Sequence, residues 1–291
     1  MSSSRSSRLR TFRTLLILGR ASNLPTVWSN CLVGWLLGGG GLDWKLLFVC
    51  VGASALYTGG MFLNDAFDAE FDRQHRRERP IPTRAIELQA VWIWGFSWIA
   101  LGLLLLGSLS VLTLLLTILL VASILLYDAI HKMITFSPVI MAACRFWLYL
   151  VAASASPDGV TGLAIWSAFA LASYIVGLSY MARKESTRGP LPYWPCYLMA
   201  APVLLALMAN PGQFARPAIV LSLVLTVWVL ISLRHALWMP QPHIGRAVSG
   251  LLAGIVLVDW LAFAIAPPSV GILLALLFGT ALVFQRFIPA T

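Results

Sequence analysis

Long apolar stretches alternate with short polar stretches along almost the whole chain. Stretches such as Leu46–Leu63, Leu88–Leu106 and Val248–Ala266 hold almost no charge, and an α-helix needs ~20 apolar residues to cross a bilayer. The pattern therefore predicts an all-α protein that crosses a membrane repeatedly. Ten spans are expected, at residues 24–41, 45–63, 88–107, 109–127, 137–155, 162–181, 192–209, 216–235, 247–266 and 269–286.

Composition and charge agree with an integral, multi-pass membrane protein. Charged residues make up only 11% of the chain, whereas a soluble domain carries ~25%. Seventeen Lys and Arg fall on one side of the predicted topology and only Lys45 and Arg216 on the other. The positive-inside rule then makes both termini and the polar loops cytoplasmic, on the inner membrane if the chain is bacterial. The net charge of +9 belongs to these loops, so no nucleic-acid partner is expected.

The chain divides into a short arm and one domain. Residues 1–20 form a basic N-terminal arm, which we expect on the cytoplasmic surface with its arginines near anionic lipid. Residues 21–291 contain no low-complexity linker and are expected to form a single transmembrane domain. The four cysteines stand singly in apolar segments, as buried thiols do. The sequence also lacks Walker, GxSxG, HExxH and CxxC motifs.

The strongest chemical signal is the segment Asn64–Asp72. Its Asp65, Asp68 and Asp72 are spaced i, i+3 and i+7, which places them on one face of a helix. Three such carboxylates repel one another unless a cation lies among them, and Mg²⁺ commonly joins a few carboxylates to substrate phosphates. The segment predicts a Mg²⁺–diphosphate site, in which Asn64 adds an amide oxygen. Glu70 points off this face and is expected in solvent or paired with an arginine.

Basic residues follow the acidic segment. Arg73 and Arg79 are candidates to bind the non-bridging oxygens of a diphosphate, whereas Arg76 and Arg77 fit topology charges. Arg79 precedes Pro80, where the chain is expected to turn back toward the membrane.

Other candidate residues lie at span ends or inside spans. Tyr127 and Lys132 lie between the fourth and fifth spans, where they can reach the diphosphate or simply snorkel to the interface. Arg145 lies inside the fifth span, and a buried arginine in a membrane usually faces a polar cavity or a partner acid. Asp259 is the other charge within a span, and one hydrogen bond from a neighbouring helix would satisfy it.

These residues resemble the UbiA superfamily of intramembrane prenyltransferases over nearly the whole chain. The sequence Asn64-Asp65-xx-Asp68-xxx-Asp72 matches the family's first aspartate-rich motif, and Arg79-Pro80-Ile81-Pro82 resembles the stretch after it. The opening Arg20–Thr26 and the pair Tyr127 and Lys132 are also similar to the family. Since the family usually has nine spans, the expected fold is a polytopic membrane helical bundle of about nine to ten transmembrane helices, with residues 269–286 either an addition or a miscounted span.

The resemblance implies a Mg²⁺-dependent transfer of a prenyl group from a polyprenyl diphosphate to a lipophilic, often aromatic, acceptor. It departs at the second motif, Ser179–Glu185, where Leu178 and Met181 stand in place of acids and only Glu185 is acidic. The implied metal ligands are Asn64, Asp65, Asp68, Asp72 and Glu185. The implied catalytic residues are Asp65, Asp68, Asp72, Lys132, Arg145 and Glu185. The implied substrate-binding residues are Asn23, Asn64, Arg73, Arg79, Tyr127, Tyr180, Arg183 and Lys184.

Two functions remain open from the sequence. A membrane prenyltransferase explains the acidic segment. A non-catalytic binder or carrier of isoprenoid lipid that retains the fold explains the degenerate second motif. A transporter fits less well, because transporters place polar residues at the bilayer midplane and the ionisable residues here lie at span ends. A CDP-alcohol phosphotransferase needs a DGxxAR pattern, which Asp68-Ala69-Glu70 does not supply.

Overall fold

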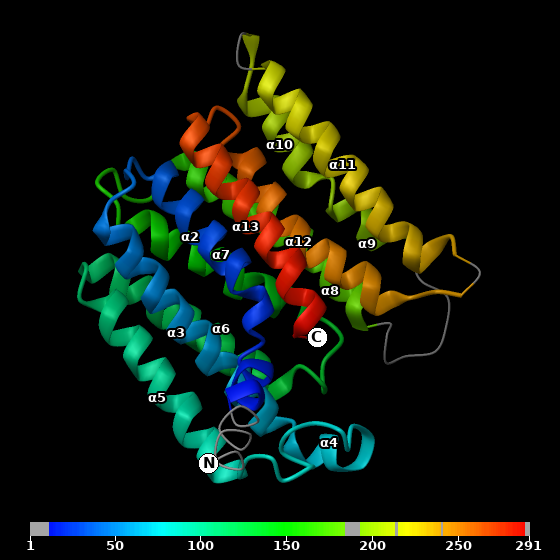
Figure 1. Cartoon of the computed structure of the whole chain (residues 1–291). Helices are drawn as coiled ribbons and strands as arrows, with labels where there is room; N and C mark the ends of the chain where they lie inside the picture. Colours follow the sequence, from blue (N-terminus) through cyan, green and yellow to red (C-terminus); the bar gives the residue numbers. More distant parts are fainter. Residues whose placement is uncertain (1–11, 184–192, 213–214, 240, 289–291) are drawn as a thin grey trace, which may run out of the picture.

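The computed structural model describes residues 12–183, 193–212, 215–239 and 241–288, and the regular structure of these residues is helical (Figure 1). A helical stretch at residues 12–18 comes first. The 3₁₀-helix η1 (Ala21–Asn23) follows it. The α-helices after η1 are α2 (Leu24–Leu37), α3 (Trp44–Phe67), α4 (Ala69–His75), α5 (Leu88–Gly107), α6 (Val111–Ile130), α7 (Ser137–Ser154), α8 (Gly162–Arg183), α9 (Trp194–Leu198), α10 (Ala201–Ala209), α11 (Ala215–Leu237), α12 (Ile244–Ala262) and α13 (Pro268–Phe287).

Eight of these helices are long and apolar enough to cross a bilayer: α3, α5, α6, α7, α8, α11, α12 and α13. The prediction of an all-helical membrane protein is confirmed. The last predicted span is present as α13, which packs against α12, α2 and η1. The two remaining predicted spans, 24–41 and 192–209, differ from the prediction.

The first predicted span is shorter than expected. Helix α2 has 14 residues and ends at Leu37, whereas the prediction extended to residue 41. The glycine run Gly38–Gly41 turns the chain instead, and Gly39 adopts a positive φ of 81°, which only glycine enters readily.

The seventh predicted span is divided into α9 and α10, with a turn at Met199 and Ala200. Pro202 lies at the start of α10. It has no N–H to donate to the carbonyl of Leu198, and its ring would clash with that carbonyl in a continuous helix. The apolar pattern alone concealed this break.

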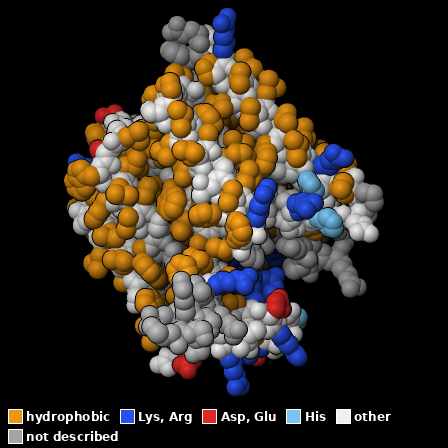
Figure 2. Space-filling view, in the orientation of Figure 1, with side chains coloured by type: hydrophobic (Ala, Val, Ile, Leu, Met, Phe, Trp, Pro, Cys, Tyr) orange, Lys and Arg blue, Asp and Glu red, His pale blue; other side chains and the backbone are white. Residues whose placement is uncertain are grey.

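The helices gather their polar connections at one end of the bundle. In Figure 1, α3, α5 and α6 form one side, α2, α7 and α12 lie centrally, and α9, α10 and α11 form the other side. Helix α4 and the loop that follows it lie at the lower end. Hydrophobic side chains cover most of the visible face above that end (Figure 2), as expected for a surface that meets lipid.

Glycines bring α3 close to α5, which packs against it along much of its length. Gly52 and Gly59 on α3 face Gly95 and Gly102 on α5. A Cβ atom at Gly59 would lie 2.8 Å from the carbonyl oxygen of Gly95, so a side chain there would push the two backbones apart. Small residues allow such close approach between membrane helices.

We expect Gly59→Val to destabilise the protein by about 2 kcal/mol, because overpacking against backbone cannot be relieved by a rotamer change. Thermal unfolding in detergent, followed by intrinsic tryptophan fluorescence, measures this. Gly279→Ala on α13 is the matched control, since its Cβ would meet nothing within 4 Å. An unchanged melting temperature in Gly59→Val would contradict the close packing.

Candidate functional site

The three aspartates of the acidic segment lie where α3 ends and α4 begins. Asp65 is in the last turn of α3, Asp68 lies between the two helices, and Asp72 is on α4. The sequence predicted a single helix here. The backbone nearly keeps that form, because the N–H groups of Asp68 and Asp72 donate to the carbonyls four residues earlier, at 3.0 and 2.8 Å. All three residues are buried, with 7% exposure or less.

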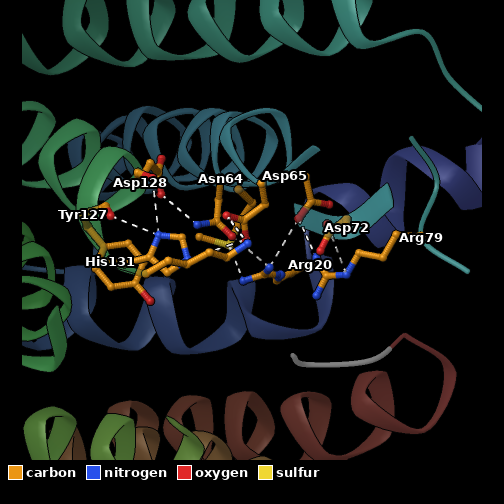
Figure 3. A network of polar contacts seen from close by, with 11 residues as sticks. Arg20, Asn64, Asp65, Asp72, Arg79, Tyr127, Asp128 and His131 are labelled. Atoms are coloured by element: carbon orange, nitrogen blue, oxygen red, sulfur yellow. Dashed lines mark hydrogen bonds and ion pairs between the residues drawn. The ribbon is translucent and has the colours of Figure 1, made fainter. Parts of the chain in front are cut away.

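Arg79 joins the first and third aspartates (Figure 3). Its Nη1 donates to Asp65 Oδ1 at 2.7 Å, and its Nε lies 3.9 Å from Asp72 Oδ2. The return of the chain toward the membrane at this point was predicted. It is fixed by Ile81, which is buried with Phe62 beside the site.

The second aspartate is paired with α6. Lys132 Nζ lies 2.6 Å from Asp68 Oδ1, and His131 Nε2 lies 3.6 Å from Asp68 Oδ2. The Lys132 ammonium also lies 3.7 Å from the centre of the Phe71 ring, a distance typical of a cation–π contact. The His131 ring stacks on Tyr127. Lys132 and Tyr127 therefore lie at the site as predicted, and the sequence analysis missed His131.

These surroundings shift the pKa values of Asp68 and Asp72 in opposite directions. Burial by itself would raise the pKa of Asp68, but the hydrogen bonds from His131 and Lys132 outweigh it and hold the pKa below its ordinary value. The pKa of Asp72 is raised, chiefly by burial, and the opposing charge of Arg79 does not cancel this. Positive charge brought beside Asp72 would favour its ionised form.

Arg20 completes this arrangement from the turn immediately before η1. Its Nη2 donates to Asn64 Oδ1 at 3.1 Å and lies 3.4 Å from Asp65 Oδ1. The residue has a positive φ of 41°, and such strain outside glycine is held in place by surrounding structure and often marks a functional site. The neighbouring Asn23 is buried, and its N–H donates to the carbonyl of Arg20 at 3.0 Å. The sequence analysis used Arg20 only for the family resemblance.

Asp128 is a fourth buried carboxylate, which the sequence analysis did not select. Its Oδ1 accepts a hydrogen bond of 3.0 Å from Asn64 Nδ2. It directly follows Tyr127, and an acid at the end of an apolar span is the signal that could have identified it.

Arg145 belongs to a separate polar network. Its guanidinium donates to Asn30 Oδ1 at 2.7 Å and to Thr26 Oγ1 at 3.1 Å, both on α2. Asn30 in turn donates to Asp259 Oδ2 at 2.7 Å, and Ser29 donates to the same oxygen. The structure thus links the two charges predicted within spans through one amide, and Arg145 does not contact the aspartates of α3 and α4.

Other predicted residues lie apart from the acidic cluster, by which we mean Asp65, Asp68 and Asp72. Arg73 pairs with the exposed Glu70 at 2.7 Å, which confirms the expectation for Glu70. Tyr180 packs edge-on against Trp194. Arg183 donates to the carbonyls of Ile134 and Thr135 and to Ser137, and so ties α8 to the loop after Lys132.

The second motif is only partly described. Lys184 and Glu185 lie outside the described residues. Leu178 and Met181, which stand in place of the expected acids, are buried in the hydrophobic core.

The donor set fits a divalent cation such as Mg²⁺. It offers carboxylate and amide oxygens, the ligands that Mg²⁺ prefers. Asp72 Oδ1 and Asp128 Oδ2 are buried and accept no hydrogen bond from the described residues. Within the same residues, no three His, Cys, Asp or Glu side chains already converge on one point. Mg²⁺ commonly uses only one or two protein carboxylates together with substrate phosphates, so a preformed cage is not required.

The fold and site define a helical integral membrane protein. Buried aspartates and the basic side chains that pair with them form a site at one end of its helical bundle. The sequence profile of the UbiA prenyltransferase family matches residues 23–247. The chain therefore belongs to the UbiA prenyltransferase family.

Two curated relatives are digeranylgeranylglyceryl phosphate synthases. Those of Methanoregula boonei and Methanopyrus kandleri are 31% and 32% identical over 91 and 90 residues. Each match covers 31% of this chain and 33% of the relative, so the chain matches about a third of their length.

Solved structures share the fold over most of the chain. A UbiA homologue from Aeropyrum pernix is 16% identical with a TM-score of 0.66, covering 83% of this chain and 96% of the homologue. A UbiA homologue from Archaeoglobus fulgidus, bound to DMAPP and Mg²⁺, is 13% identical with a TM-score of 0.56, covering 94% of this chain and 99% of the homologue.

We expect Arg79→Met to destabilise the protein by about 2 kcal/mol, because it leaves Asp65 and Asp72 buried without their shared counter-charge. Chemical denaturation in detergent measures this. Arg73→Met is the matched control and should cause no measurable change, since its pair with Glu70 is exposed. Equal effects in the two variants would contradict the assignment of Arg79.

Proposed function

We propose that this chain is a Mg²⁺-dependent membrane prenyltransferase that transfers a prenyl group from a polyprenyl diphosphate to a lipophilic acceptor. One observation carries the proposal: buried carboxylates and basic side chains meet at the C-terminal end of α3. A Mg²⁺–diphosphate needs both, because carboxylates bind the cation and basic groups bind the phosphate oxygens.

Each side chain then has a role that follows from its position. Asn64, Asp65, Asp68 and Asp72 would hold the cation by their oxygens. Arg79, Arg20 and Lys132 turn from their carboxylate partners toward the diphosphate oxygens when the substrate arrives. The geometry favours Arg79 over Arg73 for this role, because Arg73 is engaged with Glu70 in solvent. Bound Mg²⁺ supplies Lewis-acid charge withdrawal from the leaving diphosphate.

The reaction requires little covalent chemistry from the protein. The bond between C1 of the prenyl chain and the diphosphate oxygen breaks, and both electrons leave with the diphosphate. The nucleophilic atom of the acceptor forms the new bond to C1 and loses a proton. Arg20, Arg79 and Lys132 stabilise the negative charge that develops on the diphosphate. The apolar helices around the site hold the prenyl chain and keep water from the allylic carbon.

Pyrophosphate release from the purified protein tests this function. The donors are geranyl and geranylgeranyl diphosphate, and the acceptor panel includes geranylgeranylglyceryl phosphate and hydroxylated aromatic acids. We expect release that requires Mg²⁺ and falls at least 100-fold in Asp68→Ala, because the cation loses a ligand and Lys132 loses its partner. Glu70→Gln is the control, since it removes a nearby carboxylate that faces solvent.

A second candidate is a non-catalytic binder or carrier of isoprenoid lipid. The apolar, buried Leu178 and Met181 favour it, because a second acidic motif is missing at these positions. Saturable binding of geranylgeranyl diphosphate without pyrophosphate release from any donor and acceptor pair would support this reading and exclude the enzyme.

The cytoplasmic location of the site is also a proposal, supported by the charge bias of the loops. In a cysteine-free background, Ala85→Cys after α4 and Gly41→Cys before α3 report on opposite ends of the bundle, since both positions are exposed. In intact cells a membrane-impermeant maleimide should label position 41 and not position 85. Labelling of position 85 alone would invert the topology.

A further inference from the structure

The contact between α6 and α3 decides which end of the Asn64 amide faces the acidic cluster. Asn64 Nδ2 donates to Asp128 Oδ1 at 3.0 Å, while Asn64 Oδ1 accepts from Arg20 Nη2 at 3.1 Å (Figure 3). In this contact the amide NH₂ donates and the carboxyl oxygen of Asp128 accepts. Asp128 therefore holds the NH₂ end of the amide toward α6 and leaves the oxygen on the side of Arg20 and Asp65.

Asp128 differs from the other acids of the cluster. Asp65, Asp68 and Asp72 each have a basic partner, whereas in the described part of the chain Asp128 forms no ion pair. It is only 4% exposed, and its Oδ2 accepts no hydrogen bond from these residues. Keeping such a buried carboxylate is costly. Among the residues that the structure describes, its one polar side-chain contact is with Asn64, and we therefore look for its role in that contact.

The neighbouring contact shows that Asp128 is not needed to join the helices. One turn further along, Lys132, in the turn after α6, pairs with Asp68 at 2.6 Å. The pairs Asn64–Asp128 and Asp68–Lys132 follow one another where α3 and α6 end, and these two helices also contact each other. Loss of Asp128 therefore removes the hydrogen bond that holds the NH₂ end of the amide and leaves only the Arg20 contact to its oxygen, while the Asp68–Lys132 pair still joins the segments that follow α3 and α6.

We propose that Asp128 is a positioning residue for the divalent cation. It holds the Asn64 amide so that Oδ1, and not the NH₂ group, is presented to the cation bound with the substrate diphosphate. The inference rests on the proposed function. Partners that orient metal ligands typically affect metal affinity by 10–100-fold, and that is the size of effect expected here.

Mn²⁺ binding to the purified protein, measured by electron paramagnetic resonance, tests the inference without turnover. The probe is Mn²⁺ in the presence of geranyl S-thiolodiphosphate, a donor analogue whose carbon–sulfur bond resists ionisation. We expect Asp128→Ala to bind Mn²⁺ 10–100-fold more weakly, because the amide can then rotate. Asp128→Asn should stay within about threefold of the unmodified protein, since its side-chain oxygen still accepts from Asn64 Nδ2.

A second-site change separates orientation from structure. In Asn64→Asp combined with Asp128→Ala, the carboxylate at position 64 presents an oxygen in either orientation, so it needs no partner. We expect this double variant to recover most of the lost affinity. Glu70→Gln, which removes an exposed acid nearby, should bind Mn²⁺ as the unmodified protein does. If Asp128→Ala does not fold, Asp128→Ser takes its place in the comparison, because the serine side chain is too short to reach Asn64.

The outcomes are distinct. Undiminished Mn²⁺ affinity in folded Asp128→Ala or Asp128→Ser overturns the inference. So does an Asp128→Asn variant as weak as Asp128→Ala, because the charge and not the orientation would then matter. Failure of the double variant to recover also counts against it. If the unmodified protein itself binds no Mn²⁺ with the analogue, it is the proposed function that fails.

Discussion

The structure of the site depends on one constraint: carboxylates buried at the ends of apolar helices need a counter-charge or a hydrogen-bond donor beside them. Removing an ionised group from water costs several kcal/mol unless a partner compensates. Asp65, Asp68 and Asp72 meet this requirement with basic side chains from three separate segments: the turn before α2, the loop after α4 and the end of α6. The site is therefore a product of the tertiary fold and not of the acidic segment alone.

Apolar packing holds those basic groups in position. The loop after α4 is anchored by Ile81 in a small hydrophobic cluster that also contains Phe62 and Leu18. This cluster fixes the loop that carries Arg79 and the turn that carries Arg20. Arg183 performs a related task with hydrogen bonds, since it joins α8 to the loop beside Lys132. Hydrophobic contacts thus set the distances at which the ionic contacts form.

The sequence predicted the helices and the acidic segment, but not the contacts between residues that are distant in sequence. An apolar run of about 20 residues is a strong signal, so such runs located most of the helices. A single proline inside one predicted span was not visible in this pattern, and it divides that span into α9 and α10. The spacing of the aspartates located the site. It did not reveal that Arg79 and not Arg73 would meet them, because adjacent arginines look alike until the chain folds back. Arg20 and Asp128 were missed for the same reason: each acts on Asn64, a residue distant in sequence.

The polar face of α2 has a consequence for how the protein is made. Thr26, Asn30 and Ser29 leave this 14-residue helix poorly suited to stand alone in lipid. Its partner Arg145 lies 115 residues later than Asn30, and Asp259 lies 229 residues later. During synthesis α2 therefore precedes its polar partners, and its contacts can form only once α7 and then α12 have been made. Completion of the polar core is a late event in biogenesis, although it begins with the earliest helix.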